Sequence, residues 1–113
     1  MFDINFSLLV RVKNEDLLKT YISYNVNINA YQKETFTSPL MLAASLGYNH
    51  VCQILLDAGA DVHATDLEGN TSLHLAIQHV NVVQTLLDYG ANVNSLNDEG
   101  YTPLMLIQRR KRS

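Results

Sequence analysis

The chain has 113 residues, of which 47% are hydrophobic, and this length and composition fit one globular domain with a continuous core. The net charge of −3 gives no general reason to expect nucleic acid as a partner, and a single cysteine, Cys52, excludes a disulfide framework within the chain. The first residues lack the basic segment of a secretory signal, and no apolar run approaches the length of a membrane span.

We therefore expect a soluble, cytoplasmic monomer without a membrane segment. The richness of the chain in asparagine and tyrosine suggests an AT-rich genome. If the source is an intracellular microbe or virus, the cytosol of its host is the alternative location.

Two short helices are expected at the start of the chain, at about residues 5–13 and 15–23. Residues 21 to 30 repeat the pattern of residues 55 to 64, and Asn25 falls where Gly59 falls. Asparagine is the other residue that tolerates the left-handed region of backbone space. We interpret residues 1–32 as a degenerate unit that caps the N-terminal end of a repeat array.

The second unit, residues 33–65, predicts helices at about 39–46 and 49–57. Pro39 can begin the first of these helices without the loss of a hydrogen bond, and Ser38 before it is a good N-cap. The connector that leads into this unit lacks the Asp and the Gly that mark the later connectors, and it is one residue longer. A departure from a standard turn is therefore expected there.

The third unit, residues 66–96, predicts helices at about 72–79 and 81–88. It is two residues shorter than the second unit between its helices, so the chain must turn tightly at residues 78–81. The fourth unit, residues 97–113, predicts one helix at about 103–110. Two interpretations stay open for this unit: a helix that caps the array, or a fragment of a longer array.

Two sequence words recur in the same order along these units. From Leu40 to Leu73 the step is 33 residues, and from Leu73 to Leu104 it is 31. A period near 33 indicates a stacked array, in which a unit buries its apolar face only against its neighbours. The words are Ser38-Pro39-Leu40-Met41-Leu42-Ala43-Ala44, which returns from Thr71 and from Thr102, and Leu55-Leu56-Asp57-Ala58-Gly59-Ala60-Asp61-Val62, which returns from Leu86.

These repeats resemble the ankyrin repeat family. The segment Asp66-Leu67-Glu68-Gly69-Asn70-Thr71-Ser72-Leu73-His74 matches its turn and helix-start pattern at nearly every fixed position. The resemblance implies an all-α fold: a solenoid of helix-turn-helix units joined by β-turn-like connectors, with about three and a half repeats in a single domain over residues 1–113. It also implies that His74 forms structural hydrogen bonds to Thr71 and to the backbone of the adjacent turn.

In this family, variable positions at the turn and late in the first helix contact the partner. Carried onto this chain, the implied partner-binding positions are Leu46 in the second unit, Leu67, Glu68, Asn70, Gln78 and His79 in the third, and Asp98, Glu99, Tyr101, Arg109 and Arg110 in the fourth. The same carry-over implies Glu34, Thr35, Thr37 and Ser45 beside Leu46 in the second unit, where the connector departs from the family pattern.

The function implied is a non-catalytic protein–protein interaction module, an adaptor or an inhibitor, that binds a protein partner on the concave face of turns and first helices. The alternative is a regulatory or substrate-recruiting arm of a larger protein, including an enzyme. No constellation of catalytic residues or phosphate-binding loop is present in the sequence, so we expect no enzyme activity, cofactor or small-molecule substrate.

Four further features of the sequence were weighed between a structural and a functional interpretation. The four histidines lie at unrelated positions without the spacing of metal ligands, and Cys52 fits a small buried side chain better than a reactive thiol. Acidic residues at the turns keep loops solvated or form a rim for a basic partner. The basic run from Arg109 to Arg112 complements the dipole of a helix C-terminus, or serves as a nuclear address or phosphate contact.

Overall fold

A computed structural model describes the backbone of residues 3–112 and the side chains of residues 8–107. Helices account for all the regular secondary structure of these residues, and no strand occurs among them. The all-α prediction is therefore confirmed. The helices are α1 (Asp3–Val12), α2 (Glu15–Ser23), α3 (Pro39–Leu46), α4 (Asn49–Asp57), α5 (Ser72–Leu75), α6 (Val80–Asp88) and α7 (Pro103–Arg112).

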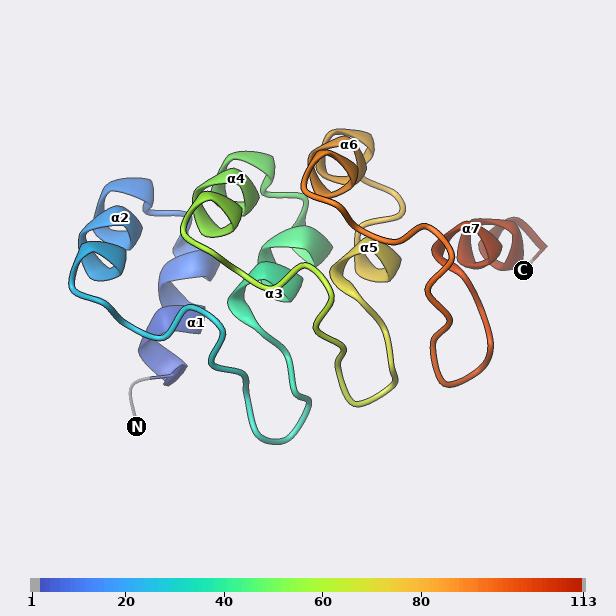
Figure 1. Cartoon of the computed structure of the whole chain (residues 1–113), viewed down its shortest axis with the longest axis horizontal. Coiled ribbons are helices and arrows are strands. Elements are labelled where there is room, and N and C mark those ends of the chain that lie inside the picture. The colour runs from blue at the N-terminus through green and yellow to red at the C-terminus, as the bar shows by residue number, and fades with distance from the viewer. Residues whose placement is uncertain (1–2, 113) are drawn as a thin grey trace.

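The helices form two rows in an elongated molecule of 43 × 27 × 24 Å. Figure 1 shows α2, α4 and α6 in the upper row and α1, α3, α5 and α7 in the lower row, with the long connectors projecting below. Within the lower row α3 packs against α1 and α5, and α5 packs against α7; in the upper row α4 packs against α6. This is the stacked array that the repeat period predicts.

The first helix of the third unit is shorter than predicted. A helix at 72–79 was expected, but α5 ends at Leu75 and the chain turns through residues 76–78. The amide of His79 donates to the Ala76 carbonyl at 2.8 Å, which closes this turn. The prediction was wrong because the two missing residues leave too little chain for another helical turn before α6 must start beside α4.

The other boundaries agree with the prediction to within two residues, and the expected caps are present. Ser38 accepts a hydrogen bond from the Met41 amide at 3.2 Å and caps α3, as predicted. Asn25 and Gly59 have φ angles of 62° and 98°, so the left-handed residues after the second helices lie where the alignment placed them.

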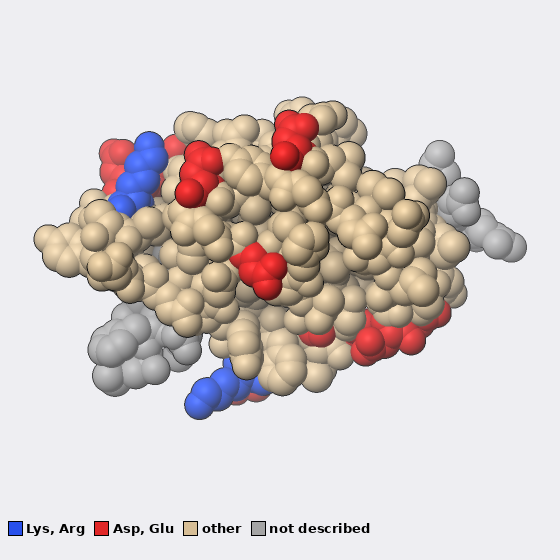
Figure 2. All heavy atoms as spheres, viewed as in Figure 1, with Lys and Arg blue, Asp and Glu red and all other residues tan. Residues whose placement is uncertain are grey.

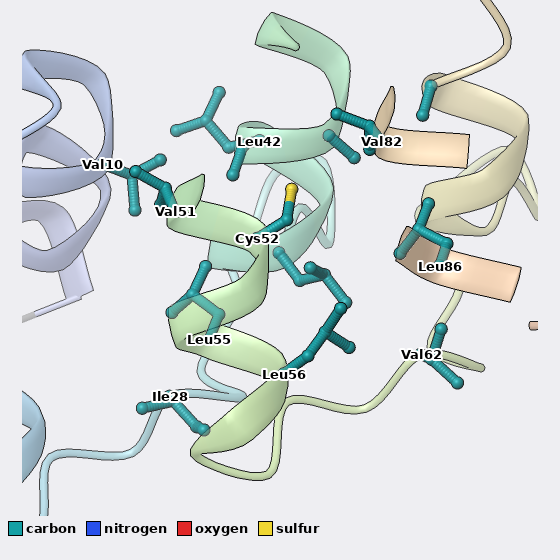
Figure 3. Close-up of a cluster of buried hydrophobic side chains, with 14 of the residues drawn as sticks. Val10, Ile28, Leu42, Val51, Cys52, Leu55, Leu56, Val62, Val82 and Leu86 are labelled. Carbon is teal, nitrogen blue, oxygen red and sulfur yellow. The ribbon is translucent and has the colours of Figure 1, made fainter. Parts of the chain in front are cut away.

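The core is continuous along the stack, because the helices of each unit pack on each other and on the helices of the next unit. Val51, Cys52 and Leu55 of α4 are fully buried, and Figure 3 shows α4 between Val10 of α1 on one side and Leu86 of α6 on the other. Because Cys52 is buried, the prediction of a small buried side chain there is confirmed. This burial raises the pKa of its thiol to about 12.

Candidate functional site

Three connectors precede α3, α5 and α7, and each is closed by a backbone hydrogen bond. The closure of the first connector spans one residue more than the other two, so the departure expected from its extra residue is present. The amides of Gln32, Asp66 and Asn97 donate to the carbonyls of Thr37, Asn70 and Tyr101 at 3.0, 2.9 and 3.0 Å. The connectors therefore project as narrow hairpins (Figure 1), which hold the residues at their tips away from the helices.

The hairpins are also bonded to one another. The Leu67 amide donates to the Thr35 carbonyl at 2.9 Å, and the Asp98 amide donates to the Glu68 carbonyl at 3.1 Å. Gly69 allows the second of these approaches, because a Cβ on Gly69 would stand 2.8 Å from the backbone nitrogen of Asp98. The three tips therefore form one backbone-linked surface and not three independent loops.

Asparagine and aspartate side chains fix the shape of the last two hairpins. The Asp66 carboxylate accepts from the amides of Glu68 and Asn70 at 2.9 and 3.0 Å. The side-chain amide of Asn97 donates to the side-chain oxygen of Asn70 at 2.9 Å. Because these polar groups are satisfied within the surface, the tips are held in shape before any partner binds.

His74 joins the third unit to the fourth. Its Nδ1 accepts from the Thr71 amide at 3.1 Å, so Nε2 carries the proton and donates to the Tyr101 carbonyl at 2.8 Å. The side chain is 1% exposed. The predicted structural role of His74 is confirmed, and the bond to Tyr101 holds the third hairpin against the helix layer.

The turn after α5 lies against the end of α3. The His79 Nε2–H group donates to the Ser45 carbonyl at 3.2 Å, and the imidazole ring packs on Gly47, where a Cβ would come within 2.6 Å of it. His79 is therefore half-buried between units, whereas its neighbours Leu46 and Gln78 are exposed.

Acidic side chains dominate the last two hairpins. Figure 2 shows them along the lower right edge, where Figure 1 places these connectors. Asp66, Glu68, Asp98 and Glu99 supply this charge, and residues 66–70 and 97–101 contain no Lys or Arg. The potential at this edge is therefore negative and attracts a positively charged surface.

The comparison with known families decides the assignment of these repeats. Residues 6–97 and 40–112 match a model of ankyrin repeats in three copies. The chain belongs to the ankyrin repeat family. Ankyrin repeats are a protein-interaction fold, and the matched segments together reach from α1 to the end of α7.

Several curated proteins share these ankyrin repeats. The chain is 37% identical to Palmitoyltransferase AKR1 of Lachancea kluyveri over 65 residues, which are 58% of this chain and 9% of that protein. It is 52% identical to Rabankyrin-5 of Homo sapiens over 40 residues, or 35% of this chain and 3% of that protein. It is 34% identical to ARF GTPase-activating protein Git of Drosophila melanogaster over 67 residues, or 59% of this chain and 9% of that protein. The matched segments thus span a small part of each of these relatives.

The structure brings some of the predicted partner-binding positions together and separates others. Leu67, Glu68, Asp98 and Glu99 lie on adjoining tips. Asn70 and His79 are partly buried and bonded within the ankyrin array, so they act on a partner mainly through the shape that they hold. The side chains of Arg109 and Arg110 lie outside the described residues.

An aromatic pair on the first hairpin was missed by the sequence analysis. Phe36 has φ 59°, a left-handed angle like the 77° of Gly69, and its ring lies 5.1 Å from that of Tyr31. Both rings are exposed. The alignment of the repeats could have revealed this position, since Phe36 stands 33 residues before Gly69 and so aligns with a glycine. A bulky residue in the left-handed region is uncommon, and such residues gather at functional sites.

Other kinds of site find little support within the described part of the chain. No group of three or more His, Cys, Asp or Glu side chains there could hold a metal ion. No helix among the described residues is both long enough and apolar enough to cross a membrane.

Proposed function

We propose that this chain is an ankyrin module that binds a protein partner through the tips of its three hairpins. We call this surface the hairpin face, and it consists of Tyr31, Thr35, Phe36, Leu67, Glu68, Asp98 and Glu99. The observation that carries the proposal is Leu67: its side chain is 60% exposed, while its backbone amide is fixed by a hydrogen bond to the neighbouring hairpin. An exposed apolar side chain on a backbone that is already held in place is typical of a binding anchor.

The charge and shape of the hairpin face indicate which kind of surface its partner needs. The apolar anchors Phe36 and Leu67 lie on the first two tips, and the acidic edge extends over the last two. Protein interfaces pair aromatic and aliphatic anchors with a polar rim. We therefore propose a partner with an apolar pocket and basic residues beside it, whose association slows and weakens as salt screens the rim.

Two roles are compatible with such a module. As a free-standing protein, it would act as an adaptor or as an inhibitor that masks its partner. As an arm of a larger protein, it would recruit a partner or substrate for an activity carried elsewhere. The second role is favoured by the relatives, since the chain spans only 3% to 11% of their lengths and they include proteins named as palmitoyltransferases and as an ARF GTPase-activating protein.

The test compares two matched variants as baits in affinity capture with quantitative mass spectrometry. Leu67→Asp places a charge on the hairpin face, and Leu17→Asp places the same charge at an exposed leucine of α2. We expect captured partners to fall at least about tenfold with Leu67→Asp and to stay unchanged with Leu17→Asp. Both variants should melt within a few degrees of the wild type, because surface substitutions usually cost under about 0.5 kcal/mol.

The opposite result, partners lost with Leu17→Asp and kept with Leu67→Asp, would place binding on the helix layer and contradict the proposal. A third measurement tests the acidic edge separately. Partner recovery should fall with Glu68→Lys and with Asp98→Lys. Recovery should also depend less on salt with these variants than with the wild type.

A further inference from the structure

Phe36 occupies a backbone position that the other two hairpins give to glycine. Its φ angle is 59°, and the equivalent Gly69 and Gly100 have φ angles of 77° and 80°. Glycine adopts this left-handed region without steric cost, whereas the Cβ atom of any other residue is crowded there. Phe36 therefore makes the first hairpin less stable than a glycine at the same place would.

Hydrogen bonds hold Phe36 in this conformation. Its amide donates to the Gln32 carbonyl at 2.6 Å, and the Gln32 amide donates to the Thr37 carbonyl at 3.0 Å. The Thr35 carbonyl accepts from the Leu67 amide of the next hairpin at 2.9 Å. A strained residue persists only where the surrounding structure determines its conformation, and such residues gather at functional sites. The hairpin thus fixes the direction in which the Phe36 side chain leaves the backbone.

The phenylalanine side chain gains no core burial in return for this strain. Phe36 is 41% exposed, and Tyr31, whose ring lies 5.1 Å away, is 51% exposed. The hydrophobic core of the described residues contains nothing between Ile28 and Leu40. Folding therefore does not explain why an aromatic residue stands at position 36, and binding is the remaining use of an exposed, oriented ring.

The aromatic pair continues onto the second hairpin. A side chain at the position of Phe36 points toward the next hairpin, since a Cβ on the equivalent Gly69 would meet Asp98. Leu67 stands in the second hairpin where Asp98 stands in the third, so it adjoins Phe36. Tyr31, Phe36 and Leu67 therefore form one exposed apolar cluster over two tips, which we call the aromatic cluster.

The exposure of Tyr31 belongs to its position in the repeat. Thr65 stands at the same position in the second hairpin, which has a hairpin on each side, and it is exposed as well. A neighbouring hairpin therefore does not cover this position, and the aromatic cluster is open wherever the array begins.

We propose that the aromatic cluster selects the partner and that Phe36 is the specificity-determining residue of the hairpin face. This inference rests on the proposed function, and it commits the partner to a folded protein with an apolar pocket that accepts an aromatic ring. The first hairpin projects from the molecule (Figure 1), so its tip fits a pocket, whereas an extended peptide needs a groove. Aromatic residues are enriched at the centres of interfaces, and leucine is under-represented among the residues that dominate binding.

Charge gives the orientation of this partner. In the first connector Lys33 offsets Glu34, whereas residues 66–70 and 97–101 carry only negative charge. The apolar pocket of the partner therefore lies over the first two tips, and its basic residues lie over the last two. Because the ring of Phe36 is oriented before binding, little conformational entropy is lost when it enters the pocket.

The experiment measures two properties of Phe36→Gly in the full chain: its melting temperature and its recovery of the proteins that the wild type captures. The melting temperature should stay the same or rise, because glycine removes the strain. Partner recovery should fall by at least about tenfold, because the ring is lost. Asn25→Gly is the matched control, since Asn25 follows α2 and has a similar φ angle of 62°. Its partner recovery should equal that of the wild type.

A second pair of variants leaves the backbone conformation unchanged. Tyr31→Ser removes the other ring of the aromatic cluster and should lower partner recovery severalfold. Tyr24→Ser removes a tyrosine that is 80% exposed at the end of α2, and recovery should not change.

Photocrosslinking identifies what lies against the ring. Benzoylphenylalanine in place of Phe36, in the full chain, should crosslink to apolar residues within a folded domain of the captured partner. A crosslink to a second copy of the chain would overturn the proposal. So would a crosslink to a segment that a protease cleaves in the free partner, because such a segment binds as a linear peptide. The same amino acid in place of Leu67 is the reference, and crosslinks at 67 without any at 36 would also contradict the role of Phe36.

The outcomes separate this inference from the proposed function. Recovery that falls with Leu67→Asp but not with Phe36→Gly would leave the hairpin face in place and remove the role of Phe36. Recovery that falls with neither variant would contradict the hairpin face itself. A lower melting temperature for Phe36→Gly would show that the ring supports the hairpin, which overturns the inference as well.

Discussion

The second and third units share two sequence words, yet they differ in helix length and in burial. α3 has 8 residues and α5 has 4. Cys52 is fully buried and Leu56 nearly so, whereas the equivalent Val83 is partly exposed and Leu87 more so. The second unit lies between two neighbours, while the third has only α7 beyond it in the described chain. Burial at a repeat position therefore depends on the next unit and not on the residue type.

The largest expected effect is on the reactivity of a thiol at the equivalent positions 52 and 83. Burial raises the pKa of Cys52 from 9.0 to about 12, so its thiolate fraction at pH 8 should be roughly a thousandfold lower than that of an exposed thiol. Reaction with a disulfide reagent should therefore be slow in the folded protein and fast in urea. The reaction in the folded protein is slow for two reasons: burial disfavours the thiolate, and it keeps the reagent from the sulfur.

The matched variant moves the thiol to the apolar groove between α6 and α7, which Val83 lines. Val83→Cys in a Cys52→Val background should react far faster than Cys52 in the folded wild type, because position 83 is only partly buried. Equal rates at the two positions would mean that the groove beside Val83 is covered in solution.

The next effect is on stability at neighbouring leucines. Leu56→Ala and Leu86→Ala should each lower the free energy of unfolding by about 2–5 kcal/mol, the range for a buried leucine. Leu87→Ala should cost less than about 1 kcal/mol, because its side chain is already partly in water. Urea titration measures all three variants. A cost for Leu87→Ala as large as that for Leu56→Ala would contradict the open groove.

A smaller effect concerns the hairpins. Gly69→Ala should destabilise the protein by about 1–3 kcal/mol, because Gly69 has φ 77° and its Cβ would press on the backbone of Asp98. Gly59→Ala serves as the control, since Gly59 also has a positive φ but open space around it. The free energy of unfolding of this control should fall only by the cost of the left-handed backbone angle, about 1–2 kcal/mol. Thermal melts of both variants give the difference, which reports the contact between hairpins.

The sequence predicted the fold well because the repeat words carry their own boundaries. Ser38-Pro39 starts a helix and Gly59 ends one, so the limits of α3 and α4 were right. The length of α5 could not be read in the same way. Its residues match those of α3, and only the two residues missing afterwards force the chain to turn at Ala76.

The candidate site was less predictable from sequence. Leu67 and Glu68 were found because turn tips are exposed in any such repeat. Phe36 was missed because its place in the hairpin depends on a left-handed backbone that the residue type disfavours. The apolar groove between α6 and α7 was missed because it consists of ordinary core positions, such as Leu87 and Leu104. Their exposure is set by the neighbouring helices and not by the local sequence pattern.

The smallest expected effect is a gain in stability at the start of α5. Ser72 stands where the second and fourth units have Pro39 and Pro103, and its buried hydroxyl has no hydrogen-bond partner among the described residues. Proline fits the first position of a helix, and Thr71 before it has the extended backbone, φ −84° and ψ 170°, that a following proline requires. Ser72→Pro should therefore raise the free energy of unfolding by about 0.5–1 kcal/mol, chiefly by restricting the unfolded chain. Pro39→Ser is the matched reverse change and should lower the melting temperature by a similar step. If Ser72→Pro instead lowered it, the N-terminus of the short α5 would differ from that of α3, and the third unit would depart from the repeat at its start as well as at its end.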